Sequence, residues 1–419
     1  MNWKIPYPPL EGVRGRIMNN RQKIKEMKII NSLIITFLLL LSISPAKTQT
    51  IREVLQQIEQ NNTVLAALKQ SGEAEKINNK TGIYLENPEV EYHYLWGNNS
   101  GVGNRTDFSV TQSFDFPTTY RYKQKVSDGK NMQVDMQYQI ESKKILLGAK
   151  NICIELIYMN IYSSELKKRL QHAQQISNAY QSKFDKGEAN ILDLNKAKLN
   201  LLNTEKELNI HETDREHLQA ELIRLNGGNT IDFALMSYDK EILPSDFEEW
   251  YTSIKGNNLL IKYLQQETEL SKKTEKLQRS MNLPKFFAGY MSEKVVSEHF
   301  QGVAVGISIP LWENKNTVKS VKAQTLARQA VVDDADFHFR NESEALYQKA
   351  TKLRQIASNY GKTMESINSS ELLKKALDAG ELSLINYIQE LEIYYDAVNN
   401  LLQTERDYQL VVAELKLWE

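Results

Sequence analysis

The chain has 419 residues, more than an ordinary single domain holds, so it contains two domains or forms one elongated repetitive body. Its 41% hydrophobic residues and its 52 basic against 53 acidic residues exclude a disordered tail protein and a general nucleic-acid binder. The single cysteine, Cys153, excludes a disulfide scaffold and a cysteine-based metal cluster. Glycine and proline are scarce, with 18 and 9 residues, which indicates long helices rather than a many-stranded sandwich.

The N-terminal part carries the one long, largely apolar run of the chain. This run, Ile29 to Ile43, follows several lysines and precedes Ser44-Pro45-Ala46. At about 15 residues it is short for a membrane-spanning helix of ~20, but it suits the hydrophobic region of a secretory signal. We therefore interpret residues 27–49 as a cleaved signal peptide and residues 1–26 as a mis-start or an extra segment, with an uncleaved anchor as the alternative.

Residues 50–226 form a first unit, with strands at about 88–97 and 105–117 where apolar and polar residues alternate. In the proline-free stretch that follows, apolar residues recur at helical spacing, and leucines at seven-residue intervals indicate coiled-coil-like packing. A continuous helix from Pro117 to Gly187 would rise roughly 100 Å. Glycine tolerates the positive φ of a helix C-terminal cap, so Gly187 predicts a reversal and an antiparallel helical hairpin.

The next segment, residues 227–256, breaks the helical pattern with a glycine pair, a proline and clustered acids. It is predicted to be either a linker or a belt packed around the helices. Residues 257–419 then form a second unit, with strands at about 284–292 and 301–310 and a hairpin turn near Gly380.

The two units match each other without gaps. Pro310 follows Pro117 by 193 residues, and Gly380 follows Gly187 by the same 193 residues. Both glycines stand in an Asp-x-Gly-Glu sequence, and chance would rarely place this match at the offset of the prolines. We infer that one unit of helix, two strands, long helix, turn and helix occurs twice.

Alternating strands of about nine residues fit either a soluble sheet with one wet face or a transmembrane barrel. The barrel is favoured because the chain is expected to be exported and because the apolar face is rich in aromatic residues, as in an interfacial girdle. Four strands cannot close around a lumen, and hydrocarbon does not tolerate an open edge, so several copies must share one barrel. The side chains predicted to face lipid are Tyr92, Tyr94, Trp96, Phe108, Val110, Phe114, Phe116, Val303, Val305, Ile307 and Ile309.

This arrangement resembles the TolC-like outer-membrane efflux channel family. The stretches Gly187 to Leu194 and Gly380 to Tyr387 are similar to the helix-turn signature of that family, and Asn87-Pro88 is similar to its opening of the first strand. The resemblance covers essentially the whole chain after the signal peptide. It implies a mainly α protein with a small transmembrane β part, in which a homotrimer forms a twelve-stranded barrel in the outer membrane, continued by a twelve-helix periplasmic tunnel.

The resemblance also implies the function. The chain would be a passive exit duct, without enzymatic activity or a cofactor, that works with an inner-membrane pump and a periplasmic adaptor and carries drugs or metal cations. The compact size and the Asn-Pro opening look most like the branch that serves resistance-nodulation-division pumps, including heavy-metal exporters. The rival interpretation is a soluble periplasmic coiled-coil adaptor or structural protein, which is disfavoured because each of the two hairpins has its own strands.

The tip of the hairpins is the predicted site of gating and adaptor contact, with solvated helix caps as the alternative interpretation. Some members of the family carry a gate of acids six and nine positions after the second glycine, where this chain has Asn386 and Gln389. The six histidines show no ligand spacing, so no metal site is predicted, and no catalytic constellation is present in the sequence. The tip residues are Asp185, Lys186, Gly187, Glu188, Asp378, Ala379, Gly380 and Glu381.

Overall fold

A computed structural model describes residues 49–98, 101–240, 242–366 and 369–419, and the side chains of residues 369–371 are not part of that description. The expected signal peptide and the segment before it lie outside these residues. Thr50–Glu419 forms one compact unit. Its elements, in chain order, are α2 (Ile51–Asn61), α3 (Thr63–Asn78), β1 (Glu89–Leu95), β2 (Arg105–Phe114), α4 (Pro117–Asp185), α5 (Ile191–Leu225), α6 (Phe247–Lys255), α7 (Leu259–Met281), β3 (Lys285–Val295), β4 (Glu298–Ser308), α8 (Thr317–Ser366), α9 (Ser369–Asp378) and α10 (Leu384–Leu415).

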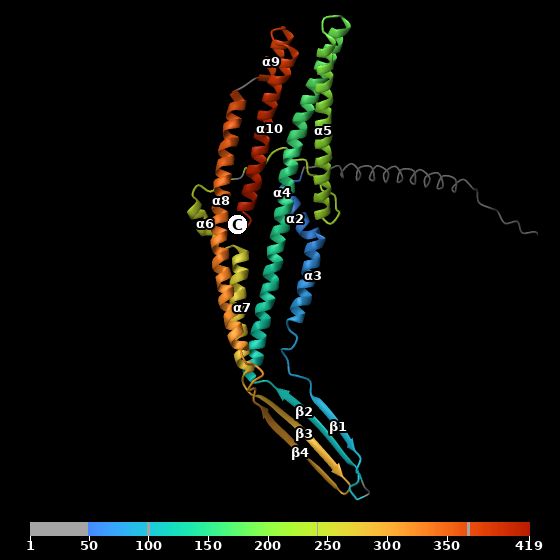
Figure 1. Ribbon diagram of the computed structural model, residues 1–419, viewed down its shortest axis with the longest axis vertical. Coiled ribbons are helices and arrows are strands. Elements are labelled where there is room, and N and C mark those ends of the chain that lie inside the picture. The colour runs from blue at the N-terminus through green and yellow to red at the C-terminus, as the bar shows by residue number, and fades with distance from the viewer. Residues whose placement is uncertain (1–48, 99–100, 241, 367–368) are drawn as a thin grey trace, which may run out of the picture. The chain divides into compact units, whose positions relative to one another are not determined.

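The long helix expected after Pro117 is present, and its 69 residues make α4 the spine of the unit (Figure 1). Proline suits the start of a helix because its fixed φ is helical and its missing N–H is not needed there. Helix α4 contacts α5, α7, α10, α3 and α2, and α8 contacts α7 and α10. The chain therefore builds two helical hairpins, α4–α5 and α9–α10, that meet along α4 and α10.

Two apolar cores hold the helices together. In the first, Ile58 of α2 and Leu222 of α5 pack on buried residues in the middle of α4, which include Leu156 and Ile157. By length and composition α4 is the one described helix that is apolar enough to cross a membrane. In this structure its apolar middle contributes to the first core instead. The second core joins α6, α8 and the end of α10.

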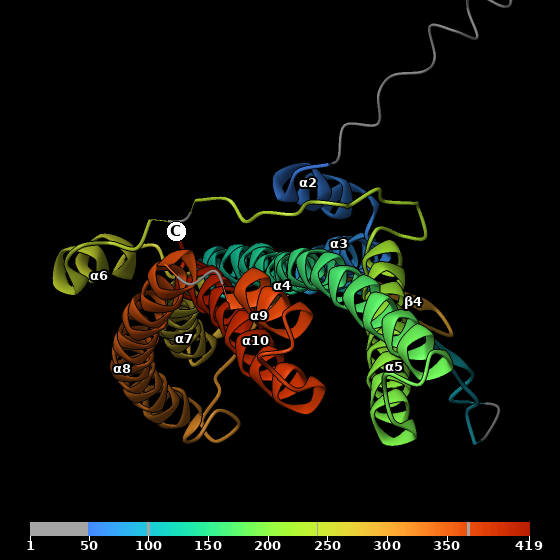
Figure 2. The ribbon, with the colours of Figure 1, turned by 90° about the horizontal axis from the view of Figure 1, so that it is seen from above.

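The segment between the units packs against both cores. Ile231 and Phe233 are 4% exposed and belong to the first core, while Trp250 and Tyr251 of α6 belong to the second. The Trp250 indole N–H donates to a carboxylate oxygen of Glu419 at 2.7 Å. Figure 2 shows the segment running beside α4 towards α6. Within one copy the described part of residues 227–256 therefore packs against the helices, and we call it the belt.

The four strands form one antiparallel sheet in the order β1-β2-β3-β4. Each hairpin comes from one half of the chain, and the pairing of β2 with β3 joins the halves. The outer edges of β1 and β4 have no partner among the described residues.

The second hairpin differs from the sequence prediction, which made residues 292–301 a loop. Strands β3 and β4 continue to Val295 and from Glu298, and only two residues form the turn between them. The polar residues of this stretch pair across the strands: Lys294 is opposite His299, and the Ser292 Oγ lies 2.8 Å from the His299 Nε2. Polar side chains do not prevent strand pairing where the hydrogen-bonded ladder itself satisfies the backbone.

The start of α8 differs from that of α4, which begins directly at Pro117. Before α8 a turn intervenes, in which the Lys315 N–H donates to the Trp312 carbonyl at 3.1 Å. Asn316 takes a φ of 70°, a left-handed conformation that asparagine adopts more readily than most residues. The Asn314 side chain donates to the Met281 carbonyl at 2.9 Å and so ties this turn to the end of α7.

Candidate functional site

One face of the sheet carries the apolar side chains. Val110 of β2 is opposite Val90 of β1 and Tyr290 of β3, and Tyr290 is opposite Val303 of β4. Because directly paired residues project to the same face and the side-chain period is two, this register determines the face of every strand residue. The predicted lipid-facing residues that lie within strands all share this face: Tyr92, Tyr94, Phe108, Val110, Phe114, Val303, Val305 and Ile307.

Three predicted members of this set lie just beyond the strand ends. Trp96 follows β1, Phe116 precedes α4, and Ile309 follows β4. Trp96 and Ile309 are 81% and 60% exposed, whereas Phe116 is half-buried against the ring of Phe286, with centroids 6.3 Å apart.

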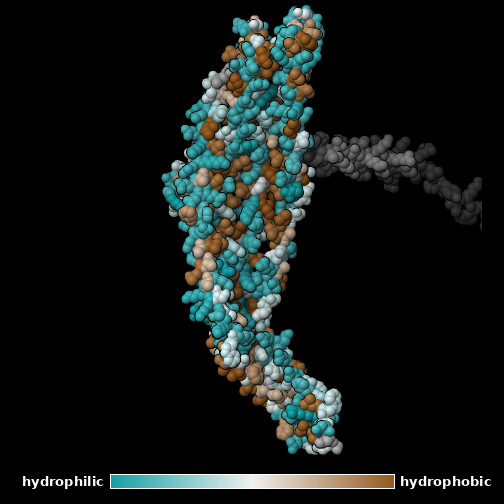
Figure 3. Space-filling view, viewed as in Figure 1, coloured by the Kyte–Doolittle hydropathy of each residue, from teal (hydrophilic) through white to brown (hydrophobic). Residues whose placement is uncertain are grey.

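The exposure of the apolar face is unusual for a chain with helical cores of this size. Val303 and Val305 are 86% and 79% exposed, and Tyr92 is 63% exposed. Figure 3 shows hydrophobic residues gathered over the part of the sheet nearest the helices. A contiguous exposed apolar surface of this kind marks contact with another protein or with a membrane.

The opposite face carries the carboxylates. All five carboxylates of the described strands project to it, as the same register requires, and Arg105 lies among them, with its Nε 2.8 Å from Asp107 and 3.2 Å from Glu293. This face also holds apolar residues such as Phe287, so it is mixed rather than purely polar. The apolar face has no carboxylate in the strands. The carboxylates are Glu89, Glu91, Asp107, Glu293 and Glu298.

The two hairpin turns have the same geometry. Gly187 and Gly380 both adopt a φ of 76°. The N–H of each glycine donates three residues back, and the N–H of the following glutamate donates five residues back, to Lys183 at 2.8 Å in the first turn and to Ala376 at 2.9 Å in the second. This pair of hydrogen bonds is the Schellman motif, in which a glycine at the positive-φ position ends a helix.

The helices that leave the turns begin with matching caps. The Asn190 side chain accepts from the Asp193 N–H at 2.9 Å, and the Ser383 hydroxyl accepts from the Asn386 N–H at 3.3 Å. Side-chain oxygens at this position satisfy free N–H groups of the first helical turn. All eight predicted tip residues are exposed, four in each turn, and Figure 1 shows both turns at the same end of the helices.

A hollow of about 330 Å³ lies beside the tip between α4, α9 and α10. It brings together Tyr180, Lys183, Lys374, Asp378 and Tyr387. Burial raises the pKa of the Tyr387 hydroxyl, and the nearby Asp378 carboxylate adds to the effect. Sequence reasoning selected Asp378 alone from this group, because the other four lie several residues from the glycine turns.

A pair of reciprocal arginine–tyrosine contacts joins the two hairpins. The Arg169 guanidinium of α4 lies 4.2 Å from the ring centre of Tyr395 on α10, and the Arg406 guanidinium of α10 lies 4.9 Å from the ring centre of Tyr158 on α4. Arg169 also donates to the Asn399 side chain at 2.8 Å. We call Tyr158, Arg169, Tyr395 and Arg406 the arginine clasp.

The clasp is symmetric in sequence as well as in space. Arg169 follows Tyr158 by eleven residues, and Arg406 follows Tyr395 by eleven residues, so each pair lies about three turns apart on one helix face. Arg169 is only 6% exposed, and burial raises the pKa of Tyr395 to about 12. Buried cation–π contacts are stronger than exposed ones, so the clasp is well placed to fix the spacing of the hairpins.

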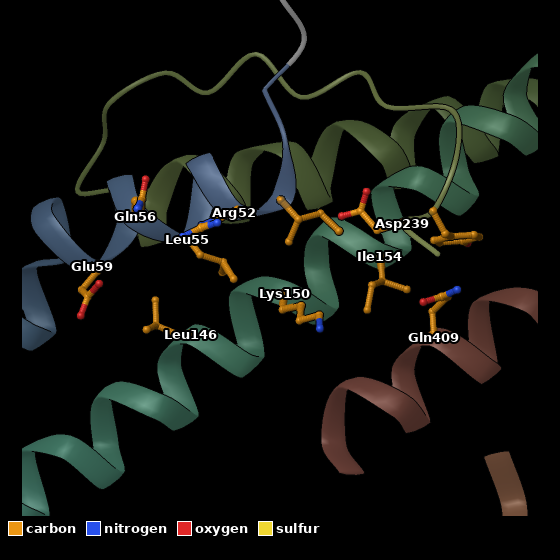
Figure 4. A pocket seen from close by; sticks show the side chains of 11 residues that line it. Arg52, Leu55, Gln56, Glu59, Leu146, Lys150, Ile154, Asp239 and Gln409 are labelled. Carbon is orange, nitrogen blue, oxygen red and sulfur yellow. The ribbon is translucent and has the colours of Figure 1, made fainter. Parts of the chain in front are cut away.

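Figure 4 shows a second hollow, of about 280 Å³, between α2, α4, the belt and α10. Its charged lining is mixed, with Arg52 and Lys150 beside Glu59 and Asp239. Among the described residues, no group of three or more His, Cys, Asp or Glu side chains is arranged to hold a metal ion. The residues that line this hollow form no catalytic arrangement. The candidate functional features of the described chain are therefore the apolar face of the sheet and the tip of the hairpins.

No protein-family model matches this sequence, and no curated protein is significantly similar to it. The fold is nevertheless similar to solved bacterial channels. The CmeC outer membrane channel of Campylobacter jejuni matches with a TM-score of 0.73 at 15% identity, over 90% of each chain. The MtrE outer membrane channel of Neisseria gonorrhoeae matches with a TM-score of 0.67 at 11% identity, over 88% of each chain. The outer membrane protein VceC of Vibrio cholerae matches with 0.65 at 11% identity, over 88% of this chain and 93% of that one.

The described chain therefore has the mainly helical fold of these outer-membrane channels. The likeness confirms, at the level of the fold, the resemblance to TolC-like efflux channels that the turns, strands and long helices of the sequence indicated.

Proposed function

We propose that the chain is a passive exit duct of the bacterial outer membrane. In this proposal three copies form a twelve-stranded barrel in the membrane and a twelve-helix tunnel in the periplasm, and the chain is a tandem repeat of one hairpin unit after a cleaved signal peptide. The observation that carries the proposal is the exposed apolar face of the sheet, which includes Val303, Val305 and Tyr92. Transfer of such a surface from water into hydrocarbon lowers its free energy.

The edges of the sheet support a barrel shared between copies. Strands β1 and β4 run in opposite directions, because the order β1-β2-β3-β4 is antiparallel throughout. The β4 of one copy can therefore pair antiparallel with the β1 of the next, and any whole number of copies gives an even-stranded barrel. Bacterial single-chain barrels have even strand numbers of eight or more, so two copies are the minimum and three give twelve.

The segregation of charge supports the same orientation. A carboxylate on the lipid face of a barrel is costly, whereas one in the lumen is solvated. All five strand carboxylates lie on the face that would line the lumen, with Arg105 paired to Asp107 and Glu293. A soluble adaptor would have no reason to expose its apolar sheet face and keep carboxylates off it.

The comparisons extend the proposal to transport. CmeC and MtrE are outer membrane channels, and MtrE has been solved in an open state. We assign to this chain the role of the outer-membrane channel in a tripartite pump, with an inner-membrane transporter that supplies energy and a periplasmic adaptor that contacts the eight tip residues. The cargo is a drug or a metal cation.

Two measurements test this function. The first is fractionation of cells that express the full chain, where we expect heat-modifiable oligomers in the outer membrane. The second is the conductance of the purified oligomer in a planar bilayer, where we expect discrete channel openings. Recovery of the chain in the soluble periplasm, or an oligomer that inserts and never conducts, would contradict the proposal.

A further inference from the structure

Basic side chains follow both strand-ending prolines. Residues 117–127 contain Arg121, Lys123 and Lys125 and no acid, and residues 310–322 contain three lysines and one acid, Glu313. Lys123 is paired with Asp115 at 2.8 Å. The other basic side chains are exposed and form no ion pair with a carboxylate of the described chain. We call these five the basic collar: Arg121, Lys125, Lys315, Lys319 and Lys322.

The end of α7 brings the two parts of the collar to the same level of the molecule. The Thr119 hydroxyl, two residues before Arg121, donates to the Ser280 carbonyl at 3.3 Å. The Asn314 side chain, next to Lys315, donates to the carbonyl of the adjacent Met281 at 2.9 Å. Both halves of the chain thus place cations around one helix end, where the helices meet the sheet (Figure 1).

The collar is unfavourable for the isolated chain. The N-terminus of a helix is the positive end of its dipole, so a cation close to it lowers the stability of the helix. Acidic residues are preferred at this end. Neither α4 nor α8 has an acid in its first turn, and Lys319 is the third residue of α8. An external anion would offset this repulsion.

The collar directly continues the apolar face. After β4 the exposed side chains of Ile309, Leu311 and Trp312 lead to Lys315, and Leu311 and Trp312 are 67% and 79% exposed. Before β1, Tyr84 is 77% exposed. An apolar band that ends in aromatic residues and then in cations is the order of layers from hydrocarbon through the interface to lipid headgroups.

We propose that the basic collar binds the phosphate groups of anionic phospholipids in the periplasmic leaflet of the outer membrane. The proposal rests on the proposed function, because it requires the apolar face to lie in the bilayer. Each collar cation strengthens the attraction to anionic headgroups, and three copies repeat the collar around the barrel. Neutral headgroups lack the net charge that this surface complements.

The experiment measures which lipid the purified full-length oligomer retains. The oligomer is equilibrated in detergent micelles that contain equal amounts of phosphatidylglycerol and phosphatidylethanolamine, and native mass spectrometry counts the bound lipids. We expect a preference of about tenfold for phosphatidylglycerol, which weakens as salt is raised because exposed charges are screened. We expect the variant R121Q/K125Q/K315Q/K319Q/K322Q to lose this preference, with a ratio close to one.

A matched pair of variants controls for charge and folding. K319Q/K322Q and K349Q/K352Q both remove two exposed lysines three residues apart on α8, but only the first pair belongs to the collar. We expect the first to reduce the preference several-fold and the second to leave it unchanged, with heat-modifiable oligomers in both. Because the milder pair keeps three collar cations, it tests the proposal even if the fivefold variant does not assemble.

Three results would overturn the proposal. They are an inserted wild-type oligomer with no preference for phosphatidylglycerol, a fivefold variant that keeps the wild-type preference, and an equal loss of preference in K319Q/K322Q and K349Q/K352Q. Millimolar inorganic phosphate is the competing arm, and complete displacement of lipid by it would assign the collar to a free anion instead. Failure of the proposed function has a different signature, since the chain would then be soluble without detergent and retain no lipid at all.

Discussion

At the scale of single residues, two glycines and a half-buried carboxylate have specific physical consequences. Gly187 and Gly380 need no extra space, because a Cβ at either position would meet nothing within 4 Å. Their requirement is conformational, since both hold a φ of 76°. Substitution there therefore tests backbone strain in the tip turns without steric clash.

We expect Gly187→Val or Gly380→Val to destabilise its turn by about 1–2 kcal/mol, because a left-handed backbone is strained for L-residues and most of all for β-branched ones. Pump-dependent drug or metal resistance should fall while the amount of outer-membrane oligomer stays near wild type. Gly187→Asn is the control, because asparagine tolerates this conformation. Unaltered resistance in both valine variants would remove the tip turns from the functional site.

The Glu405 carboxyl is half-buried in α10, and this burial raises its pKa above the ordinary value of 4.5. A carboxyl with a raised folded-state pKa holds its proton more tightly in the folded than in the unfolded chain. Its contribution to stability is therefore lost as the pH rises from the unfolded towards the folded pKa, and a penalty remains at neutral pH.

We expect Glu405→Gln to raise the melting temperature of the purified oligomer at pH 7 to 8 and to change it much less near pH 4, where the carboxyl is mostly protonated in both states. Glu414→Gln, an exposed carboxylate on the same helix, should change neither value. Thermal melts across this pH range provide the measurement. A lower melting temperature of Glu405→Gln at neutral pH would show that the carboxylate has a favourable partner in the assembly.

At the scale of elements, the arginine clasp joins α4 and α10. The sheet has one apolar face and one face that carries the carboxylates. The clasp links residues more than 220 positions apart, such as Arg169 and Tyr395. Sequence periodicity identifies the helix face on which such residues lie, but it does not identify the partner helix. The clasp therefore had no signal in the sequence beyond the shared eleven-residue spacing of its tyrosines and arginines.

A double-mutant cycle of Arg169→Gln and Tyr395→Leu should give a coupling energy of about 2 kcal/mol, which is typical of a desolvated cation–π contact. The symmetric cycle of Arg406→Gln and Tyr158→Leu should give a similar value. Unfolding of the detergent-solubilised protein measures both. Purely additive effects in the two cycles would show that the arginines and tyrosines of the clasp do not stabilise each other.

Val305→Arg should impair assembly, at an expected cost of about 2–4 kcal/mol if the position lies near the bilayer midplane. Ser109→Arg is the matched control on the opposite face of the sheet, where Glu91 lies close, with 3.5 Å between the Ser109 Oγ and its carboxylate. The yield of heat-modifiable oligomer from outer membranes measures the effect. Equal yields from the two variants would show that neither face meets lipid.

The faces of the strands could be predicted from the sequence because a side-chain period of two requires no knowledge of the partner strand. The ends of β3 and β4 could not. Ser292 and His299 belong to a polar stretch that resembles a loop, and only the cross-strand register shows that they pair. The left-handed turn at Asn316 escaped prediction for a similar reason, since Pro117 begins a helix without any such turn.

At the scale of the whole molecule, the sheet of the described chain is open on both sides. Its sheet has two unpaired edges and an exposed apolar face, while its helices have well-formed cores of their own. The long helices and glycine turns could be predicted from local signals such as the absence of proline. The belt after α5 could not, because only its contacts with α4 and α8 distinguish it from a linker.

We propose that β1 of one copy pairs with β4 of the next until the ring closes, and cysteine cross-linking between these edges is the decisive experiment. In a Cys153→Ala background, Tyr92→Cys on β1 is combined with a cysteine at Val303, Val305 or Ile307 on β4, and the outer-membrane protein is oxidised. We expect at least one combination to give a covalent species of three chains and no larger product. Cross-links confined to single chains, or an open ladder that continues beyond three, would contradict it.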